Sequence, residues 1–143
     1  MIVRGLNVSD LPQALTFWRA VPEVELNDSD TPEQLATYLL RNPGLSAVAF
    51  TDKDIVGAAL YCQDMCGHDG RRGYLNHLAV AAPYHKRGLG KALVDYCLAH
   101  LSRVGITKCN IFVPENNAGQ TFWRRLHFQE KPWALLQRSC DGA

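Results

Sequence analysis

The sequence has almost no net charge and no long apolar run, and each absence removes a class of function. Fifteen lysines and arginines nearly balance fourteen aspartates and glutamates, leaving a formal charge of +1. No overall field attracts nucleic acid or an anionic membrane, so we expect neither as a partner. No stretch approaches the ~18–20 consecutive apolar residues that span a bilayer. The first ten residues also lack the cationic start and apolar core of a secretory signal.

Cysteine is present, but without a pairing framework. Five cysteines form an odd set with no repeated spacing, which is typical of reduced thiols, so we expect a cytoplasmic protein. Cys62, Cys66 and His68 lie close enough in sequence to suggest zinc. A structural zinc site takes four ligands, usually in two tight pairs, and no second pair is present. We therefore expect no metal.

The apolar content is sufficient for a single folded domain. Of 143 residues, 47% are apolar, and a chain of this length buries roughly 70% of its unfolded surface. No repeat or linker divides it, so we expect one domain over residues 1–143. Periodicity and turn residues predict the order β-α-α-β-β-β-α-β-α-β-β. Strands are expected at 1–7, 45–51, 55–63, 74–80 and 108–113 and as a pair within 128–138, and helices at about 9–20, 31–42, 88–103 and 116–126. This is an α/β (α+β) mixed sheet with helices on both faces.

Helix boundaries carry recognisable local signals. Ser9 is the expected N-cap of the first helix, and Thr31 caps the second, with Pro32 in its first turn. Gly105 follows the third helix, where a C-terminal glycine ends helices in the left-handed conformation. These signals predict where three helices begin or end.

The most informative segment is the strand, turn and helix over residues 78–93. The turn is basic and contains Gly88, and Gly90 follows in the first turn of an amphipathic helix. The first N–H groups of a helix lack intrahelical partners, and the helix dipole adds roughly half a positive charge there. Glycines let a phosphate approach the backbone closely. Further donors come from His85, Lys86, Arg87 and Lys91. The segment predicts a cradle for a diphosphate.

Glycine spacing alone does not establish this cradle. A Gly-x-Gly at a helix start also arises from simple packing of a helix on a strand. The dinucleotide fingerprint needs a third glycine, whereas Ala92 and Leu93 follow here. On the residues alone, diphosphate binding and plain packing both stay open.

Two longer runs resemble the GNAT superfamily of acyl-CoA-dependent N-acetyltransferases. They read LAVAAPYHKRGLGKALV and GITKCNIFVPENNAGQTFWRRLHF, and they match the family's L-x-V strand end, [Q/R]-x-x-G-x-[G/A], N-x-x-A-x-x-F-Y and L-G-F motifs. The match covers residues 74–128. The resemblance implies a mixed, mainly antiparallel sheet of about six to seven strands. It also implies an acyltransferase with acetyl-CoA as co-substrate.

The same resemblance implies which residues hold acetyl-CoA. Backbone groups of Leu78, Ala79 and Val80 would hold the pantetheine arm. The pyrophosphate would be held by His85, Lys86, Arg87, Gly88, Leu89, Gly90 and Lys91. Asn116 corresponds to the family's coenzyme-contacting asparagine, with Asn117 as the one-residue alternative, and Trp123 is placed at the acyl tunnel. A gap between strands 75–80 and 108–113 would admit the thioester.

The sequence departs from the family pattern at four positions. His85 replaces the usual Gln or Arg, and Lys86 stands where glycine is common. Both side chains remain donors, so the phosphate prediction is unaffected. Trp123 replaces a tyrosine that often protonates the leaving thiolate, and His127 replaces the glycine of L-G-F. The usual acid is therefore missing.

Candidate catalytic groups lie near the strand end. A backbone N–H near Val80 would polarise the thioester carbonyl. An imidazole side chain changes its charge near neutral pH, so His77 is a candidate base, although a strand histidine bonded to a neighbour is the alternative. Tyr84 would replace the missing acid, unless it only packs in the turn. Further candidate bases are Tyr74, Glu25 and, through a water, Asn76.

An acidic segment precedes the second predicted helix. Glu23, Glu25, Asp28 and Asp30 fall within ten residues, and in the resembling family this loop borders the acceptor site. Glu25 and Asp28 are thus candidate substrate-binding residues for a primary amine, either a small cationic amine or a peptide N-terminus. The alternative is an ordinary solvated surface.

Three interpretations of the whole chain compete. The leading one is an amine N-acetyltransferase acting by direct attack in a ternary complex. The second is a catalytically weak or inactive acyl-CoA-binding sensor or regulatory module, which the missing tyrosine favours. A nucleic-acid-binding domain is opposed by the near-zero charge and by the absence of any known motif. The resemblance also allows a homodimer, since family members often pair through their last strands.

Overall fold

The computed structural model describes residues 1–22, 24–64, 71–113 and 119–141. It divides into two compact units, Met1–Ile111 and Phe112–Ala143, which are described separately. Within the described ranges, no helix is both long and apolar enough to cross a bilayer. The single domain expected over residues 1–143 stays a prediction.

The first unit is built on a five-stranded sheet in the order β1-β2-β3-β4-β5. Neighbouring strands are antiparallel except β4 and β5, which are parallel. The strands are β1 (Ile2–Gly5), β2 (Ala47–Thr51), β3 (Asp54–Asp64), β4 (Arg72–Val80) and β5 (Lys108–Asn110). The expected mixed, mainly antiparallel sheet is confirmed.

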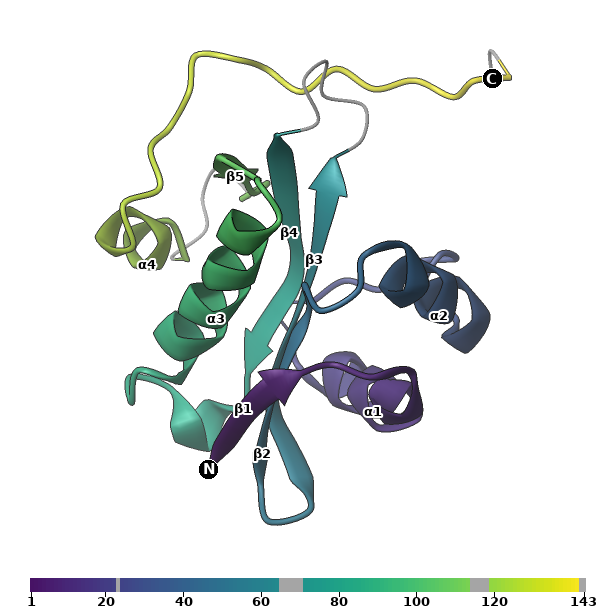
Figure 1. The fold of residues 1–143 in the computed structure, drawn as a ribbon, viewed down its shortest axis with the longest axis vertical. Helices are drawn as coiled ribbons and strands as arrows, with labels where there is room; N and C mark the ends of the chain where they lie inside the picture. Colours follow the sequence, from purple (N-terminus) through teal and green to yellow (C-terminus); the bar gives the residue numbers. More distant parts are fainter. Residues whose placement is uncertain (23, 65–70, 114–118, 142–143) are drawn as a thin grey trace. The chain divides into compact units, whose positions relative to one another are not determined.

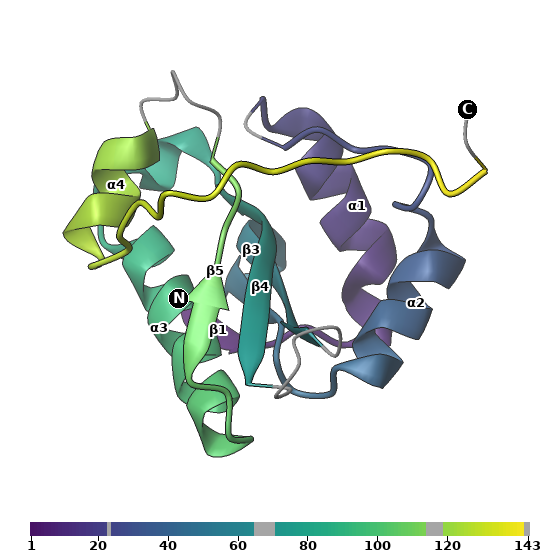
Figure 2. The ribbon, with the colours of Figure 1, turned by 90° about the horizontal axis from the view of Figure 1, so that it is seen from above.

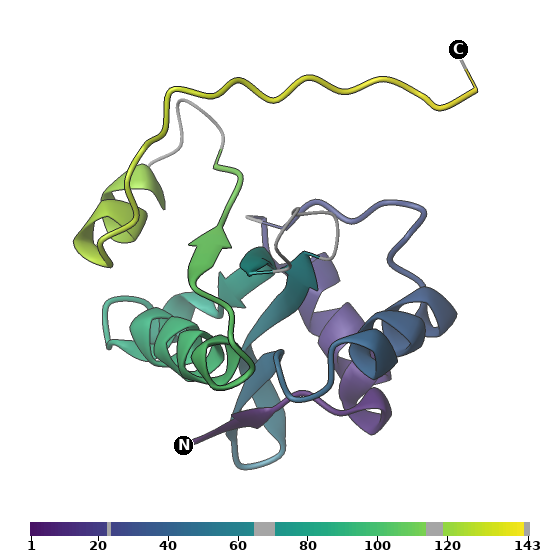
Figure 3. The same cartoon turned by 45° about the horizontal axis from the view of Figure 1, so that its top comes forward.

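Helices cover both faces of this sheet, as predicted. α1 (Leu11–Ala20) and α2 (Pro32–Arg41) lie on one face and α3 (Leu89–Arg103) lies on the other (Figures 1 and 3). Two short 3-10 helices, η1 (Val8–Asp10) and η2 (Ala82–Tyr84), precede α1 and α3. The view from above shows β3 and β4 between the two helical layers (Figure 2).

The four-residue spacing predicted for α3 matches its buried face. Leu89, Leu93, Cys97 and Leu101 are all buried, and burying side chains of this kind removes roughly 25 cal/mol of unfavourable hydration per Å² of apolar surface. α3 approaches β3 closely at Gly57, where an added Cβ would lie 2.9 Å from Leu93 Cδ1. The glycine therefore sets how near α3 lies to the sheet.

Two of the three predicted helix boundaries are confirmed and one is wrong. Thr31 Oγ1 accepts the N–H of Gln34 at 3.1 Å, and Gly105 has φ of 88° after α3. The predicted cap Ser9 lies instead inside η1. Asp10 precedes α1, and its carboxylate accepts the N–H of Asn7 at 2.8 Å. The Asp10 carboxylate, three residues after Asn7, closes this turn in place of the expected Ser9 hydroxyl.

The second unit contains α4 (Gly119–Arg125) and an extended segment after it. The strand pair predicted within 128–138 is wrong, because none of the described residues 119–141 is a strand. Over the ranges that the structure describes, the sheet accordingly has five strands rather than six to seven. Alternating apolar residues form a strand only with a hydrogen-bonded partner. Here Pro132 removes a donor, and Trp133, Leu135 and Leu136 are exposed.

Candidate functional site

β4 carries a bulge near its end that positions the site. Leu60 pairs with Asn76 and Ala58 pairs with Ala79, so two residues of β4 lie opposite one residue of β3. His77 and Leu78 are the two residues that lie opposite Ala59 alone. His77 has φ of 53°, a left-handed conformation that is uncommon outside glycine. A bulge bends a strand and redirects its side chains, so the segment after it leaves the regular course of the sheet.

The edge of β4 next to β5 is open after the bulge. The parallel ladder joins Arg72–Tyr74 to Lys108–Asn110 only, whereas β4 continues to Val80. In the described part of the first unit, no ladder covers the later half of this edge. The gap predicted between strands 75–80 and 108–113 corresponds to this unpaired part of the β4 edge. β5 ends at Asn110 rather than at residue 113.

The backbone of Val80 points into this open edge. Ala81 N–H donates to the Val56 carbonyl at 2.8 Å, which makes Gly57 and Val80 a non-hydrogen-bonded pair of the antiparallel ladder. Residues of such a pair direct their own N–H and C=O away from the partner strand. His85 Nε2 lies 2.6 Å from the Val80 carbonyl oxygen and donates to it. This contact ties the basic turn to the strand end.

The turn before α3 uses two left-handed residues. Lys86 has φ of 60° and Gly88, the N-cap of α3, has φ of 82°. The first bond inside the helix runs from Ala92 N–H to the Gly88 carbonyl at 3.0 Å. The N–H groups of residues 89–91 therefore precede the first intrahelical donor and point out of the helix start. These groups, together with the dipole, favour an anion there.

Side chains predicted to surround this helix start are exposed but partly engaged. Lys91 Nζ pairs with Asp95 Oδ2 one turn later. The Arg87 guanidinium lies 5.6 Å from the centre of the Tyr84 ring, which places the predicted acid in a cation–π contact. His85, Lys86 and Arg87 are all exposed. The predicted diphosphate residues thus lie together around one helix start.

His77 is held by a buried carboxylate and by a tryptophan. Its Nε2 lies 2.7 Å from Asp30 Oδ1, and the Asp30 side chain is 6% exposed. Trp18 Nε1 donates to the His77 carbonyl at 2.8 Å, and the two rings meet edge to face with centroids 5.5 Å apart. Buried polar groups need such partners. The contacts explain how the left-handed backbone at His77 is maintained.

A pocket of about 280 Å³ lies between α2 and β4 on the face that carries α1 and α2. The loop before α2, one side of α2, and neighbouring residues of β3 and β4 line it. Its polar lining includes Asp30, Gln34, Thr37, Arg41, Asn76 and His77. The candidate base and its carboxylate partner therefore border a cavity large enough for a small molecule.

The two predicted substrate-binding carboxylates do not line this pocket, and other predicted residues belong to the second unit or lie outside the described ranges. Glu25 and Asp28 are exposed, and neither borders the pocket. Trp123 belongs to the second unit, where its ring packs on Phe122 and Phe128 with centroids 4.9 Å and 5.2 Å away. Asn116 and Asn117 lie outside the described residues, as do Glu23, Cys66 and His68. Among described residues, no group of three histidine, cysteine or acidic side chains is placed to hold a metal ion.

Two departures from the family pattern fall on left-handed residues. Lys86 and His127 stand at positions where glycine is usual, and their φ angles are 60° and 69°. Glycine adopts this region without a steric penalty, whereas a residue with a Cβ is strained by ~1–2 kcal/mol. The backbone of this chain therefore keeps the turn geometry that the glycines would provide.

Sequence reasoning missed Asp30 and Arg41 as site residues. Asp30 was noted only as one carboxylate in an acidic segment, and Arg41 only as part of a helix. The spacing of Asn27 and Asp30 carried a local signal, because the Asp30 carboxylate accepts the Asn27 N–H at 2.9 Å. Nothing local connects either residue to His77, which lies 47 residues after Asp30.

Comparisons with solved structures agree with this fold. The chain is similar to PaiA N-acetyltransferase from Thermoplasma acidophilum in complex with coenzyme A, with TM-score 0.76, 17% identity, and 93% and 92% of the two chains covered. It is similar to glucosamine-6-phosphate N-acetyltransferase from Arabidopsis thaliana, with TM-score 0.69, 15% identity, and 96% and 97% covered.

A third structure of this kind is an aminoglycoside acetyltransferase from an uncultured soil metagenomic sample, in complex with sisomicin. Its TM-score is 0.68 at 17% identity, with 96% and 95% of the chains covered. No curated protein matches this chain as a relative. At these identities the structural likenesses establish the fold.

The family is established by a match to the sequence itself. The model of the acetyltransferase (GNAT) family matches residues 11–128, which span β4, the basic turn and α3. This chain belongs to the acetyltransferase (GNAT) family.

Proposed function

We propose that this protein transfers an acetyl group from acetyl-CoA to a primary amine by direct attack in a ternary complex. The observation that carries the proposal is the open edge of β4. It presents the Val80 N–H, and β4 leads through a short turn to the outward N–H groups at the start of α3. One continuous surface thus offers donors for a thioester at one end and for a pyrophosphate at the other.

The start of α3 suits the pyrophosphate of acetyl-CoA. Residues 89–91 offer backbone donors, and Lys86 and Arg87 add positive charge. At Gly88 an added Cβ would meet nothing within 4 Å, so the surface outside the N-cap is open to a ligand. Lys91 would exchange its exposed partner Asp95 for a phosphate oxygen, since exposed ion pairs contribute only ~0–1 kcal/mol.

Bound acetyl-CoA supplies an acetyl thioester as the acyl donor. The Val80 N–H points to the edge where this carbonyl would lie, and a fixed donor stabilises the charge that develops on the oxygen during attack. The leaving thiolate has an ordinary pKa of about 8.5, so turnover does not require a strong acid. Tyr84 is the candidate proton donor, from its place between β4 and α3.

His77 would take the proton from the acceptor ammonium. An alkylammonium has a pKa of about 10.4, so its deprotonation at pH 7 costs roughly 5 kcal/mol. With Asp30 ionised, the His77 Nε2–H donates to it, and the lone pair of Nδ1 is left to accept the proton. Asp30 then stabilises the imidazolium that forms. This carboxylate–imidazole pair supports His77 over the other candidate bases.

For the acceptor we propose a small cationic amine or a peptide N-terminus. The exposed carboxylates of Glu25 and Asp28 raise the local concentration of cations next to the pocket-forming loop. Structures named for glucosamine 6-phosphate and for aminoglycosides resemble this chain equally in fold, so this likeness selects no acceptor. We expect reversal of the charges of Glu25 and Asp28 to raise the KM for cationic amines. An unchanged KM would contradict a role of these two residues in binding the acceptor.

One observation favours a second function. Trp123 stands where family members often have the tyrosine acid, as expected of a module that binds acyl-CoA without turnover. Calorimetric titration with acetyl-CoA and transfer assays on an amine panel, on the same sample, separate the two functions. Micromolar binding with transfer supports the enzyme, and binding without transfer supports the sensor. Absence of binding contradicts both.

A further inference from the structure

We propose that the pocket between α2 and β4 binds an amine acceptor that also carries an anionic group, a carboxylate or a phosphate. Arg41 would hold the anionic group while the amine lies at His77. The inference rests on the acetyl transfer proposed above and narrows its acceptor. It favours a zwitterionic amine over a purely cationic one.

The charges that line the pocket point to this class of ligand. Among the residues that the structure describes, the charged side chains in its lining are Asp30 and Arg41, and His77 lies beside them. The Asp30 carboxylate is already engaged by His77 and by the Asn27 N–H. Within the described part of the chain, the Arg41 guanidinium makes no hydrogen bond or ion pair. A guanidinium binds carboxylates and phosphates through paired N–H donors, so Arg41 is the group available for a ligand anion.

The two ends of the pocket are separated along α2. Asp30 lies just before the Thr31 cap, at the N-terminal end of α2, whereas Arg41 is the last residue of the helix. Gln34 and Arg41 line the same side, and at about 1.5 Å per residue they lie ~10 Å apart along the axis. This is the length of the side of the pocket that α2 forms, and a flexible acceptor with a few carbons between its amine and its anion can lie along it. The volume of about 280 Å³ suits a molecule of that size.

The acidic segment before α2 does not cancel the positive charge of Arg41 at one end of the pocket. Glu25 and Asp28 are exposed and do not line the pocket, so they face water, where charges are strongly screened. Arg41 is exposed as well, but it lines the cavity itself and can contact a ligand there directly. A short-range contact with Arg41 therefore outweighs the more distant repulsion by the loop.

The test uses acceptors that differ only at the end remote from the amine. Aminohexanoate carries an anion there, hexylamine a methyl group and diaminohexane a second ammonium. Aminohexyl phosphate distinguishes phosphate from carboxylate. We expect the wild-type protein to show the lowest KM for one of the two anionic acceptors. A lower KM for diaminohexane, or equal values for all four, would overturn the inference.

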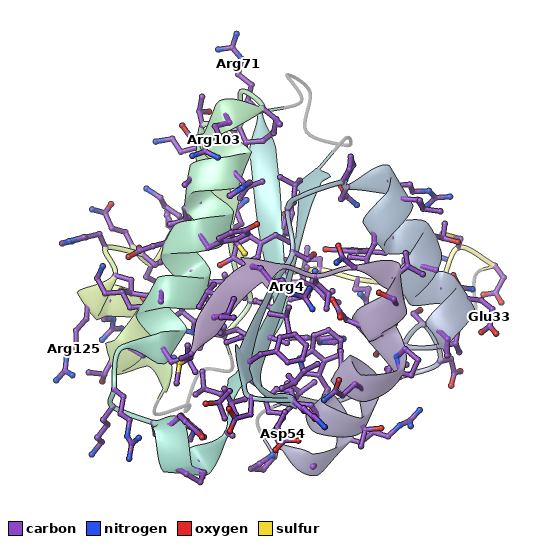
Figure 4. The ribbon with its side chains drawn as sticks, turned by 60° about the horizontal axis from the view of Figure 1, so that its bottom comes forward. Arg4, Glu33, Asp54, Arg71, Arg103 and Arg125 are labelled. Carbon is purple, nitrogen blue, oxygen red and sulfur yellow. The ribbon has the colours of Figure 1, made fainter. Side chains whose placement is uncertain are left out.

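Variants assign the preference to Arg41. We expect Arg41→Ala to raise the KM for the preferred anionic acceptor about tenfold, equivalent to ~1.4 kcal/mol, with little effect on hexylamine. Arg41→Lys should restore part of the loss. The control is Arg103→Ala, since Arg103 lies on α3, on the opposite side of the sheet from α2 (Figure 4). An equal rise for hexylamine in Arg41→Ala would mean that Arg41 only shapes the pocket.

A binding measurement separates this inference from the proposed enzyme activity. Calorimetric titration of aminohexanoate and aminohexyl phosphate into the protein saturated with coenzyme A needs no turnover. Binding that Arg41→Ala weakens supports the anion site even if no amine is acetylated. If Arg41→Ala transfers acetyl groups as fast as the wild type and neither anionic ligand binds through Arg41, the proposed enzyme activity is supported and the anion site is overturned.

Discussion

Nε2 of His77 lies 2.7 Å from Oδ1 of Asp30, and this bond joins the bulge of β4 to the loop before α2. The same histidine receives the Trp18 indole N–H on its backbone carbonyl. Ring and backbone of His77 are therefore fixed by two elements distant in sequence. The pair borders a pocket of the size of a small acceptor, and this arrangement yields the first predictions.

Replacing His77 should affect transfer most at neutral pH. We expect His77→Gln to lower kcat/KM for an alkylamine about 100-fold at pH 7, within the range of a general base. The loss should shrink as the pH approaches the ammonium pKa of about 10.4, because the amine then loses its proton to water. Steady-state rates between about pH 6 and pH 10 check this. A loss of equal size at every pH would contradict a role as base.

Asp30 is bonded to the ring of His77, so we expect Asp30→Asn to lower activity less than the replacement of His77 does. Asp30→Asn keeps an oxygen for the His77 N–H but removes the charge that stabilises the imidazolium. We expect kcat to fall about tenfold, ~1.4 kcal/mol, and the pH profile to shift, while the Kd for acetyl-CoA stays unchanged. A variant with lower thermal stability and an unaltered pH profile would show that Asp30 only holds the loop.

Gly88 and Gly44 form a matched pair for the helix-start site. Their φ angles are 82° and 75°, and an added Cβ meets nothing within 4 Å at either position. Alanine at either position should lower the free energy of unfolding by ~1–2 kcal/mol through left-handed strain. Only Gly88→Ala should also raise the Kd for acetyl-CoA, measured by calorimetry. An equal Kd in both variants would exclude the start of α3 as the pyrophosphate site.

Trp18 is expected to stabilise the bulge. Trp18→Phe removes the indole N–H that donates to the His77 carbonyl, and losing the donor to a desolvated acceptor costs ~1–3 kcal/mol. Urea unfolding measures the loss. The control Trp133→Phe changes a side chain that is 81% exposed, so its free energy of unfolding should stay within ~0.5 kcal/mol. Equal losses in the two variants would refute the role of the indole.

Asp10 should make the protein sensitive to acid. Its carboxylate accepts one hydrogen bond from each terminal nitrogen of the Arg4 guanidinium, at 2.7 and 2.9 Å, and this hydrogen bonding lowers the pKa of Asp10. A lowered pKa means that the carboxylate stabilises the fold above its unfolded pKa of about 3.9 and loses this contribution as the pH falls through the lower folded value.

The substitution Asp10→Asn measures this contribution. It should cost ~1–3 kcal/mol at neutral pH, and the difference from wild type should shrink below about pH 4. Urea unfolding at a series of pH values checks it, with the exposed Asp54 (Figure 4) changed to Asn as control. If the difference in the free energy of unfolding between Asp10→Asn and wild type does not depend on pH, the Arg4–Asp10 contact stabilises the fold through packing and hydrogen bonding rather than through charge.

Signals that act over a few residues were readable without the structure. Thr31 beside Pro32 marked the start of α2, Gly105 marked the end of α3, and the four-residue spacing within α3 identified its buried face. Capping and amphipathic burial depend on neighbours within one or two turns. The same locality explains why the basic turn around Gly88 was placed correctly at a helix start.

Features that depend on a partner residue distant in sequence could be predicted only in part. The alternating residues within 128–138 indicated strands, but a strand forms only where a ladder partner is present, and none of these residues is in a ladder. The acidic loop indicated a cationic acceptor, yet its members differ: Asp30 is buried and bonded to His77, whereas Glu25 and Asp28 face solvent. Composition does not distinguish a paired carboxylate from a solvated one.

The sequence by itself determined the family, the order of the first nine elements and the position of the basic turn at the start of a helix. These depend on motifs and on short-range backbone chemistry. The tertiary structure alone decided the bulge at His77, the outward N–H of Val80 and the pairing of His77 with Asp30. Each of these follows from the register of β3 against β4 and from the packing of α1 and α2 on the sheet. Register and packing are settled by contacts between residues tens of positions apart, which no local pattern encodes.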